Sequence, residues 1–204
     1  MRILITAGPT VEPLDAVRFL SNRSSGRLGY EIAKRARARG HAVTLVSGPV
    51  ALAAPRGVRL VRVESAREML AACRREFRRA DVLVMAAAVA DYRPANALAR
   101  KRHKQGAKVM LSLVRNPDLL AALCRRKGKR VAVGFALENS LSTRVALSKM
   151  RAKGCDAIVL NALPSMGGEG FRAVLLEGRR AIRLGPDKRR AAAKIVRWLE
   201  SKAR

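Results

Sequence analysis

"DVLVMAAAVA", Asp81–Ala90, is a continuous apolar run that follows a single aspartate. A strand covered by helices on both faces has this unbroken apolar character, whereas a half-exposed strand alternates apolar and polar residues. The run is too short to cross a bilayer, which takes roughly 20 residues. The stretch therefore predicts a central strand of a parallel sheet in an α/β domain.

Shorter β-like runs alternate with amphipathic helices on both sides of this strand. The runs are "RILITA" (2–7), "AVTLVSG" (42–48), "VRLVRV" (58–63), "RVAVGFA" (130–136) and "DAIVLN" (156–161). Helices are predicted over 28–39, 66–79, 141–153 and 191–203, with another begun by Asn116 as its cap and Pro117 in its first turn. Ser65 and Glu68 form a capping box. This alternation predicts a parallel sheet with right-handed crossovers, and 171–185 predicts a terminal hairpin.

The pattern is interrupted once, between Asp91 and Arg115. This stretch holds Pro94, the basic cluster "RKRHKQG" and a β-like "KVMLSLV", and it reads as an excursion from the sheet. We find no repeat and no linker, so residues 1–204 are interpreted as one domain. The chain opens directly with a strand and shows no secretion signal, so we expect a cytoplasmic protein with no membrane partner.

Charge is the unusual compositional feature. Lys and Arg number 43 against 15 Asp and Glu, a net charge of +28, while aromatic residues make up only 3%. Such a surface attracts polyanions whatever the site does. Two interpretations stay open: a solvated arginine-rich surface, or a biological polyanion partner such as a nucleic acid. The three cysteines show no zinc-like spacing with the two histidines and are expected to be buried thiols.

Ligands of an open parallel sheet bind beyond the carboxyl ends of its strands. The strand-end candidates are Gly8-Pro9-Thr10, Ser47-Gly48, Ala86 to Asp91, Phe135 and Asn161. Ser24, Ser25 and Gly26 precede a helix, whose free N–H groups and partial positive charge suit a phosphate. The alternative for these three residues is an ordinary serine cap.

Each of the remaining candidates also has two interpretations. Ala86, Ala87 and Ala88 leave room for a flat ring, or allow close packing of a helix on the strand. Asp91 is placed for a ribose hydroxyl or a metal-held phosphate, or is a solvated loop residue. Four cations offer charge to phosphates or simply meet water: Lys101 and Lys104 in the excursion, and Lys149 and Lys153 on one helix face.

Taken together, these segments resemble phosphopantothenate–cysteine ligases. The resemblance rests on "ITAGPTVEPLDAVRFLSNRSSGRLGYEIA", "VTLVSGPV", "AAAVADYRP", the lysine cluster, "NPDLL" and "VGFALEN", in that order. It implies a Rossmann-like three-layer parallel sheet with helices on both faces and a β-rich dimerisation excursion at about 92–115. It also implies a homodimer of a coenzyme A biosynthesis enzyme that uses CTP and Mg²⁺.

The implied reaction has two steps. The carboxylate of 4'-phosphopantothenate attacks CTP and releases pyrophosphate, and the amine of L-cysteine then attacks the acyl-cytidylate to give the amide and CMP. By resemblance, Asn22 and Lys101 are the catalytic residues, for the second and the first step respectively. The implied nucleotide-binding residues are Ala86, Ala87, Ala88, Asp91, Arg115, Asn116, Pro117, Asp118, Leu119, Phe135, Lys149 and Lys153; the implied phosphate or substrate contacts are Ser24, Ser25, Gly26 and Lys104.

Several details depart from the family pattern or leave alternatives open. His103 stands where a lysine is usual, and "MGGEGF" (166–171) replaces a more polar stretch. Most bacterial relatives are fused to a decarboxylase, which we here expect to be a separate chain. No metal ligands are assigned. An ATP-using ligase, and a basic nucleic-acid-binding protein on a nucleotide-binding fold, remain the alternatives.

Overall fold

The computed structural model describes residues 1–104, 106–162 and 171–202. Within these ranges one sheet of eight strands forms in the order β12-β11-β10-β9-β6-β1-β4-β5. The strands are β1 (Arg2–Ala7), β4 (Ala42–Ser47), β5 (Arg59–Arg62), β6 (Val82–Met85), β9 (Val131–Glu138), β10 (Ala157–Ala162), β11 (Ala173–Glu177) and β12 (Arg180–Arg183). From β5 to β10 all neighbours pair in parallel. This part has the doubly wound order of a Rossmann fold.

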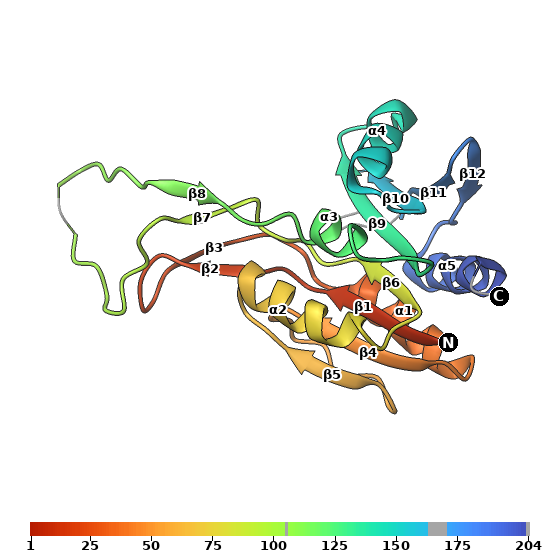
Figure 1. Ribbon diagram of the computed structural model, residues 1–204. Coiled ribbons are helices and arrows are strands. Elements are labelled where there is room, and N and C mark those ends of the chain that lie inside the picture. The colour runs from red at the N-terminus through yellow and green to blue at the C-terminus, as the bar shows by residue number, and fades with distance from the viewer. Residues whose placement is uncertain (105, 163–170, 203–204) are drawn as a thin grey trace.

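The predicted terminal hairpin is confirmed at one edge of the sheet. β11 pairs antiparallel with both β10 and β12. The complete sheet is therefore mixed, with a parallel part and an antiparallel edge, and Figure 1 shows this edge beside α5 (Lys188–Lys202).

Helices cover both faces of the sheet, as expected for three layers (Figure 1). α1 (Arg27–Ala38) and α5 pack on one face, in a core cluster that includes Ile3 and Ile5. α2 (Ala66–Phe77), α3 (Leu119–Cys124) and α4 (Thr143–Lys153) pack on the other, in a cluster that includes Leu4. Side chains alternate between the two faces along β1, so this strand is buried on both sides.

Two helix starts test the predicted caps. The Ser65 Oγ accepts from the Glu68 amide at 3.2 Å, which confirms the cap of α2. The predicted cap of α3 is wrong: Asp118 caps it, with its Oδ1 accepting from the Ala121 amide at 3.0 Å, and Pro117 lies before the helix. The Asn116 Oδ1, the atom with which this residue could cap the helix, accepts instead from the Arg93 guanidinium at 3.2 Å, and the side-chain nitrogen of Asn116 donates to the Ala90 carbonyl at 2.9 Å.

The central strand is shorter than the apolar run that predicted it. β6 ends at Met85, and of the alanines that follow only Ala88 still pairs, in an isolated parallel bridge with Pro9. The Ala87 amide donates instead to the Thr6 Oγ1 at 3.1 Å, and the Ala90 amide to the Thr10 Oγ1 at 2.9 Å. The second half of the run is therefore a loop held by threonine hydroxyls.

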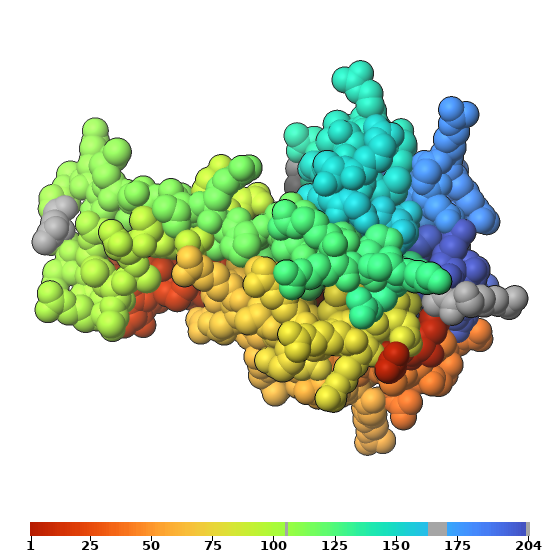
Figure 2. Space-filling model, viewed as in Figure 1, coloured from red at the N-terminus to blue at the C-terminus, as the bar shows by residue number. Residues whose placement is uncertain are grey.

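The predicted excursion is an arm, residues 92–115, that projects from the body of the protein (Figures 1 and 2). β7 (Tyr92–Pro94) and β8 (Leu113–Arg115) pair antiparallel at its base. A second small hairpin, β2 (Val11–Pro13) with β3 (Phe19–Ser21), lies beside it. Most of the β-like "KVMLSLV" forms no strand, and only its last two residues enter β8.

Asp15 fastens the arm to the β2–β3 hairpin. Its buried carboxylate accepts from the amides of Val17 and Arg18, both at 2.8 Å, and from the arm amide of Arg102 at 3.1 Å. The Arg18 side chain binds the same carboxylate and the carbonyl of Arg102. These donors, the Arg18 amide first, hold the pKa of Asp15 well below its usual range.

The described residues contain three free cysteines, all buried, as expected. Burial raises the pKa of Cys73 and Cys124 to about 12 and also raises the pKa of Cys155. None of the described helices has the length and apolar character that a membrane span requires.

Candidate functional site

A cavity of about 760 Å³ lies beyond the carboxyl ends of β6, β9 and β10. It is next to the boundary of β1 and β6, where the strand order reverses, which is the usual ligand position in doubly wound sheets. Apart from Lys101 and Lys104, every residue that the family resemblance assigns to the site lines it: Asn22, Ser24, Ser25, Gly26, Ala86, Ala87, Ala88, Asp91, Arg115, Asn116, Pro117, Asp118, Leu119, Phe135, Lys149 and Lys153. Of the other strand-end candidates, Asn161 lines the cavity, whereas Gly8-Pro9-Thr10 and Ser47-Gly48 do not.

The start of α1 forms one wall of the cavity. Gly26 is the residue before the helix, with a φ of 71°, and no side chain caps the first turn. The N–H groups of that turn are therefore left to a ligand or to water. A Cβ on Gly29 would lie 2.6 Å from the Cβ of Ala7, so this glycine lets α1 approach β1 closely. The serine-cap alternative does not hold, since α1 has no side-chain cap.

The loop after β6 forms the floor of the cavity. The Ala88 amide donates to the Gly8 carbonyl at 2.9 Å, and the Ala88 carbonyl accepts from Thr10 at 3.1 Å. The side-chain amide of Asn22 donates to the same Ala88 carbonyl at 2.9 Å. The alanine backbone is thus fixed by contacts with the loop after β1, and its small side chains leave the cavity open.

Two cations reach the opposite wall from α4. The Lys149 Nζ lies 2.6 Å from a Glu138 oxygen, and the Lys153 Nζ lies 3.3 Å from an Asp118 oxygen. Both lysines line the cavity, as does Phe135 from β9. The predicted pair therefore faces the cavity, and each lysine is partly neutralised by a carboxylate.

Asn161, at the end of β10, has an unusual side chain. Its Oδ1 is the one buried side-chain N or O atom, among the described residues, that lacks a hydrogen-bond partner. Buried polar groups are nearly always paired, so an orphan acceptor in a cavity wall suits a ligand that donates an N–H or O–H. Its position at a strand end was the only sequence signal for this residue.

Lys101 and Lys104 are not brought to the cavity. Both are exposed residues of the arm, as is His103, and none of the three lines the 760 Å³ cavity of the same chain. Most of the predicted "MGGEGF" departure lies outside the described residues. Two cations that the sequence analysis missed, Arg27 and Lys188, do line the cavity.

The described residues contain no group of three or more His, Cys, Asp or Glu that could hold a metal ion. Asp91 and Asp118 line the cavity separately. A magnesium ion brought in by a triphosphate needs only one or two protein carboxylates, since phosphates and water complete its shell. Asp91 and Asp118 fit a magnesium site of this kind, in which the protein supplies one or two carboxylates.

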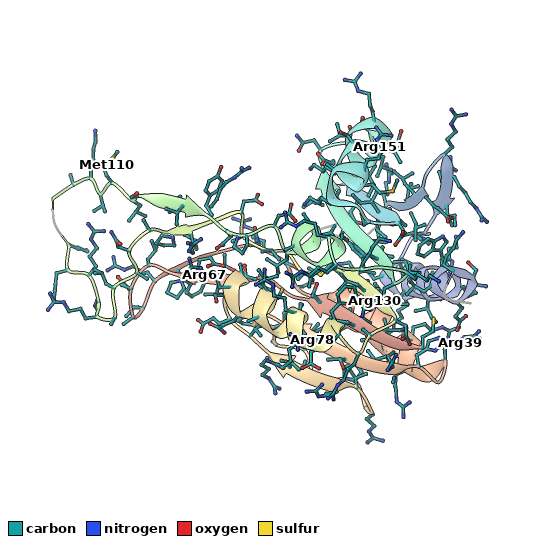
Figure 3. The ribbon with its side chains drawn as sticks, viewed as in Figure 1. Arg39, Arg67, Arg78, Met110, Arg130 and Arg151 are labelled. Atoms are coloured by element: carbon teal, nitrogen blue, oxygen red, sulfur yellow. The ribbon has the colours of Figure 1, made fainter. Side chains whose placement is uncertain are left out.

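The positive charge is spread over several elements. Figure 3 shows Arg67 and Arg78 at α2, Arg130 before β9 and Arg151 on α4, all on different parts of the surface. This distribution is typical of a generally cationic surface. A polyanion could contact such a surface at several different places.

Comparison with known proteins identifies the family. The model of the "DNA/pantothenate metabolism flavoprotein C-terminal domain" matches residues 1–202. The coenzyme A biosynthesis bifunctional protein CoaBC of Mycobacterium bovis is 44% identical over 182 residues, which cover 83% of this chain and 42% of that protein. CoaBC of Escherichia coli K12 is 42% identical over 177 residues, which cover 85% and 43%. The chain thus spans less than half the length of these relatives.

Solved structures agree with the sequence comparison. The crystal structure of the C-terminal domain of a CoaBC protein has a TM-score of 0.85 at 38% identity, covering 98% of this chain and 94% of that one. The crystal structure of the DNA/pantothenate metabolism flavoprotein from Streptococcus pneumoniae has a TM-score of 0.87 at 20% identity, covering 98% of this chain and 99% of that one, and this likeness shows the fold alone. The chain belongs to the family of the DNA/pantothenate metabolism flavoprotein C-terminal domain.

Proposed function

We propose that the protein is a phosphopantothenate–cysteine ligase that uses CTP. The observation that carries this proposal is the cavity beside the β1–β6 boundary, where Asn22, the alanine loop and the α4 lysines line one space. The relatives named for coenzyme A biosynthesis support it.

In the first step, a carboxylate oxygen of 4'-phosphopantothenate attacks the α-phosphorus of CTP. A new O–P bond forms, the bond to the β-phosphate oxygen breaks, and pyrophosphate leaves with the electron pair. Lys149 and Lys153 supply positive charge to the triphosphate, which displaces their carboxylate partners. Lys101 stabilises the charge that builds on the transferring group.

In the second step, the cysteine amine attacks the acyl carbon of the mixed anhydride. The C–N bond forms, the C–O bond to the phosphate breaks, CMP leaves, and the amine loses a proton. An amide group has two N–H donors. One N–H of Asn22 holds the Ala88 carbonyl, so the other is available to the developing oxyanion.

A magnesium ion would enter with the triphosphate and neutralise part of its charge. Asp91 is the carboxylate that suits it best. Asp91 follows the alanine loop and lines the cavity, and within the described residues its side chain has no ion pair or hydrogen bond. Asp118, in contrast, already caps α3 and contacts Lys153.

The arm supports a homodimer as the working form. It exposes a run of apolar side chains, and Met110 is 93% exposed and points away from the arm (Figure 3). A contiguous exposed apolar patch is typical of an interaction surface. If the arm packs on a second copy, Lys101 can reach the cavity of that copy. Lys101 lies outside the cavity of its own chain, so its proposed role in the first step depends on such a contact.

Pyrophosphate release tests the proposal directly. The purified protein is given phosphopantothenate and Mg²⁺ with CTP or ATP in turn, and product is followed after cysteine is added. Release with CTP supports the proposal, and release with ATP alone identifies the ATP-using alternative. No release with either nucleotide, together with tight RNA binding at physiological salt, would favour the nucleic-acid-binding alternative.

A further inference from the structure

A second cavity, of about 1410 Å³, adjoins the first. It lies between α1, the segment 52–56 and the start of α5, and it shares Arg27, Phe171 and Lys188 with the first cavity. Its cationic lining residues are Arg27, Lys34, Arg37, Arg56, Lys188, Arg189 and Arg190. We call this space the basic groove.

The two acidic residues of the basic groove are already engaged. Glu31 contacts Arg189 at 3.9 Å. The Asp187 carboxylate accepts from the Arg190 amide at 2.8 Å and contacts the Arg190 side chain at 3.5 Å. Neither carboxylate is left to neutralise the cations at the wall between the two cavities.

Arg27, Lys188 and Phe171 line both cavities, and the first two carry the positive charge of the wall between the cavities. Among the described residues, neither side chain has an ion pair or a hydrogen bond, and Lys188 is half-buried. Burial first, and then repulsion from Arg27, lowers the pKa of Lys188. Two neighbouring cations, one of them partly removed from water, carry a free-energy cost that a bound anion removes.

The positions of Arg27 and Lys188 indicate that the ligand of this wall is an anion. Arg27 is the first residue of α1, directly after the turn Ser24–Gly26, and Lys188 is the first residue of α5. The lysines of the opposite wall, by comparison, already have carboxylate partners. The cavity therefore has a second cationic wall, and this wall includes the uncapped first turn of α1.

We propose that Arg27 and Lys188 form a subsite for a phosphate group carried by a substrate of the ligase. The planar guanidinium of Arg27 donates paired hydrogen bonds to the phosphate oxygens, and the ammonium group of Lys188 supplies a compact positive charge. This inference rests on the proposed function. Two sources share the chemistry: the polyphosphate tail of the nucleotide, and the phosphate monoester of 4'-phosphopantothenate. The basic groove beyond the wall keeps the potential positive along the approach.

Inorganic pyrophosphate is a probe that does not depend on the reaction. Its binding is measured by calorimetry at about 0.15 M salt, where distant charges are screened. The double variant Arg27→Ala with Lys188→Ala is compared with Arg126→Ala with Lys129→Ala, which removes the same charge from an exposed region before β9. We expect the first pair to weaken binding at least about tenfold, the loss of one or more charge-assisted hydrogen bonds, and the control to leave it unchanged. Equal weakening in both, or no saturable binding in the wild type, overturns the inference.

Steady-state kinetics then distinguishes the two sources. A higher KM for CTP or ATP in the wall variant assigns the subsite to the nucleotide tail. A higher KM for phosphopantothenate assigns it to the phosphate monoester. If the wild type is active and neither KM changes, the inference is wrong while the proposed function stands. If the wild type is inactive with every substrate, the proposed function fails, and pyrophosphate binding alone decides whether an anion subsite exists.

Discussion

The side-chain amide of Asn22 donates a 2.9 Å hydrogen bond to the backbone carbonyl of Ala88, across 66 residues of sequence. This bond joins the segment before α1 to the loop after β6. Those two segments border the point where the strand order reverses, and both line the cavity. Asn22 is therefore held by the same backbone that would contact the nucleotide.

Asn22 and Lys101 should fail at different steps. Asn22→Ala should allow pyrophosphate release but slow amide formation by about 10²-fold or more, the usual loss for one oxyanion donor. Lys101→Ala should suppress pyrophosphate release itself. Single-turnover measurements of pyrophosphate and of amide product separate the steps, and failure of both variants at one step contradicts the division of roles.

Mixing the same two variants tests whether the arm acts across a dimer. If Lys101 serves the cavity of a second copy, a mixed dimer regains one complete site. Random mixing should then restore about a quarter of wild-type activity, since half of the dimers are mixed and each has one good site of two. Additive, unrestored activity after subunit exchange would show that each chain uses its own Lys101.

Asn161→Ala should separate ligand binding from stability. The buried Oδ1 has no partner to lose, so the free energy of unfolding should change by no more than about 0.5 kcal/mol. Binding of the nucleotide or of phosphopantothenate, each titrated alone, should weaken about tenfold for the one that donates to this oxygen.

Ser47→Ala is the matched control for Asn161, because the Ser47 hydroxyl is buried and satisfied. It bonds with the Tyr30 hydroxyl at 3.1 Å and donates to the Gly48 carbonyl at 2.8 Å. Its removal leaves buried partners unpaired, so stability should fall by about 1–3 kcal/mol. A similar loss in Asn161→Ala would mean that Asn161 has a structural role.

Gly29→Ala should push α1 away from β1. A new Cβ would meet the Ala7 Cβ at 2.6 Å, and overpacking of this kind costs about 1–3 kcal/mol. Chemical denaturation measures the loss, and nucleotide binding should weaken too, because the first-turn N–H groups move. Arg35→Ala, on the exposed side of the same helix, should change stability by less than about 0.5 kcal/mol.

Acid should release the arm through Asp15. The pKa of Asp15 is lowered in the folded protein, chiefly by the Arg18 amide, so its stabilising contribution is complete above the unfolded pKa of about 3.9 and is lost as the pH falls toward the folded value. Hydrogen exchange of the Arg102 amide, which binds Asp15, should accelerate over that range.

The variant Asp15→Asn should accelerate the same exchange at neutral pH, because an amide nitrogen would face the arginine donors. Asp81→Asn is its control, since Asp81 binds the amide and guanidinium of Arg2, at the start of β1. This control should leave exchange in the arm unchanged. Equal protection of Arg102 in all three proteins would show that Asp15 does not hold the arm.

Local sequence was a good guide to the elements and to most of the cavity. The strand-end positions of Ala86 to Asp91 and of Phe135 predicted that these residues lie together, because the carboxyl ends of parallel strands meet at one edge of the sheet. Local sequence was a poorer guide to side-chain partners, since it predicted the Ser65 cap of α2 but not the cap of α3. Asp118 caps α3, whereas the Asn116 side chain bonds with Arg93 through its oxygen and with the Ala90 carbonyl through its nitrogen.

The sequence by itself determined the order of strands and helices, the apolar central strand, the Ser24–Gly26 turn before α1 and the limits of the arm. These features follow from periodicity and from residue types over a few positions. Only the tertiary structure decided that Arg27 and Lys188 share a wall, that Asn161 has an orphan oxygen, and that Lys101 lies outside its own cavity. Such relations depend on which strands become neighbours and on how the crossovers return, and no short stretch of chain contains that information.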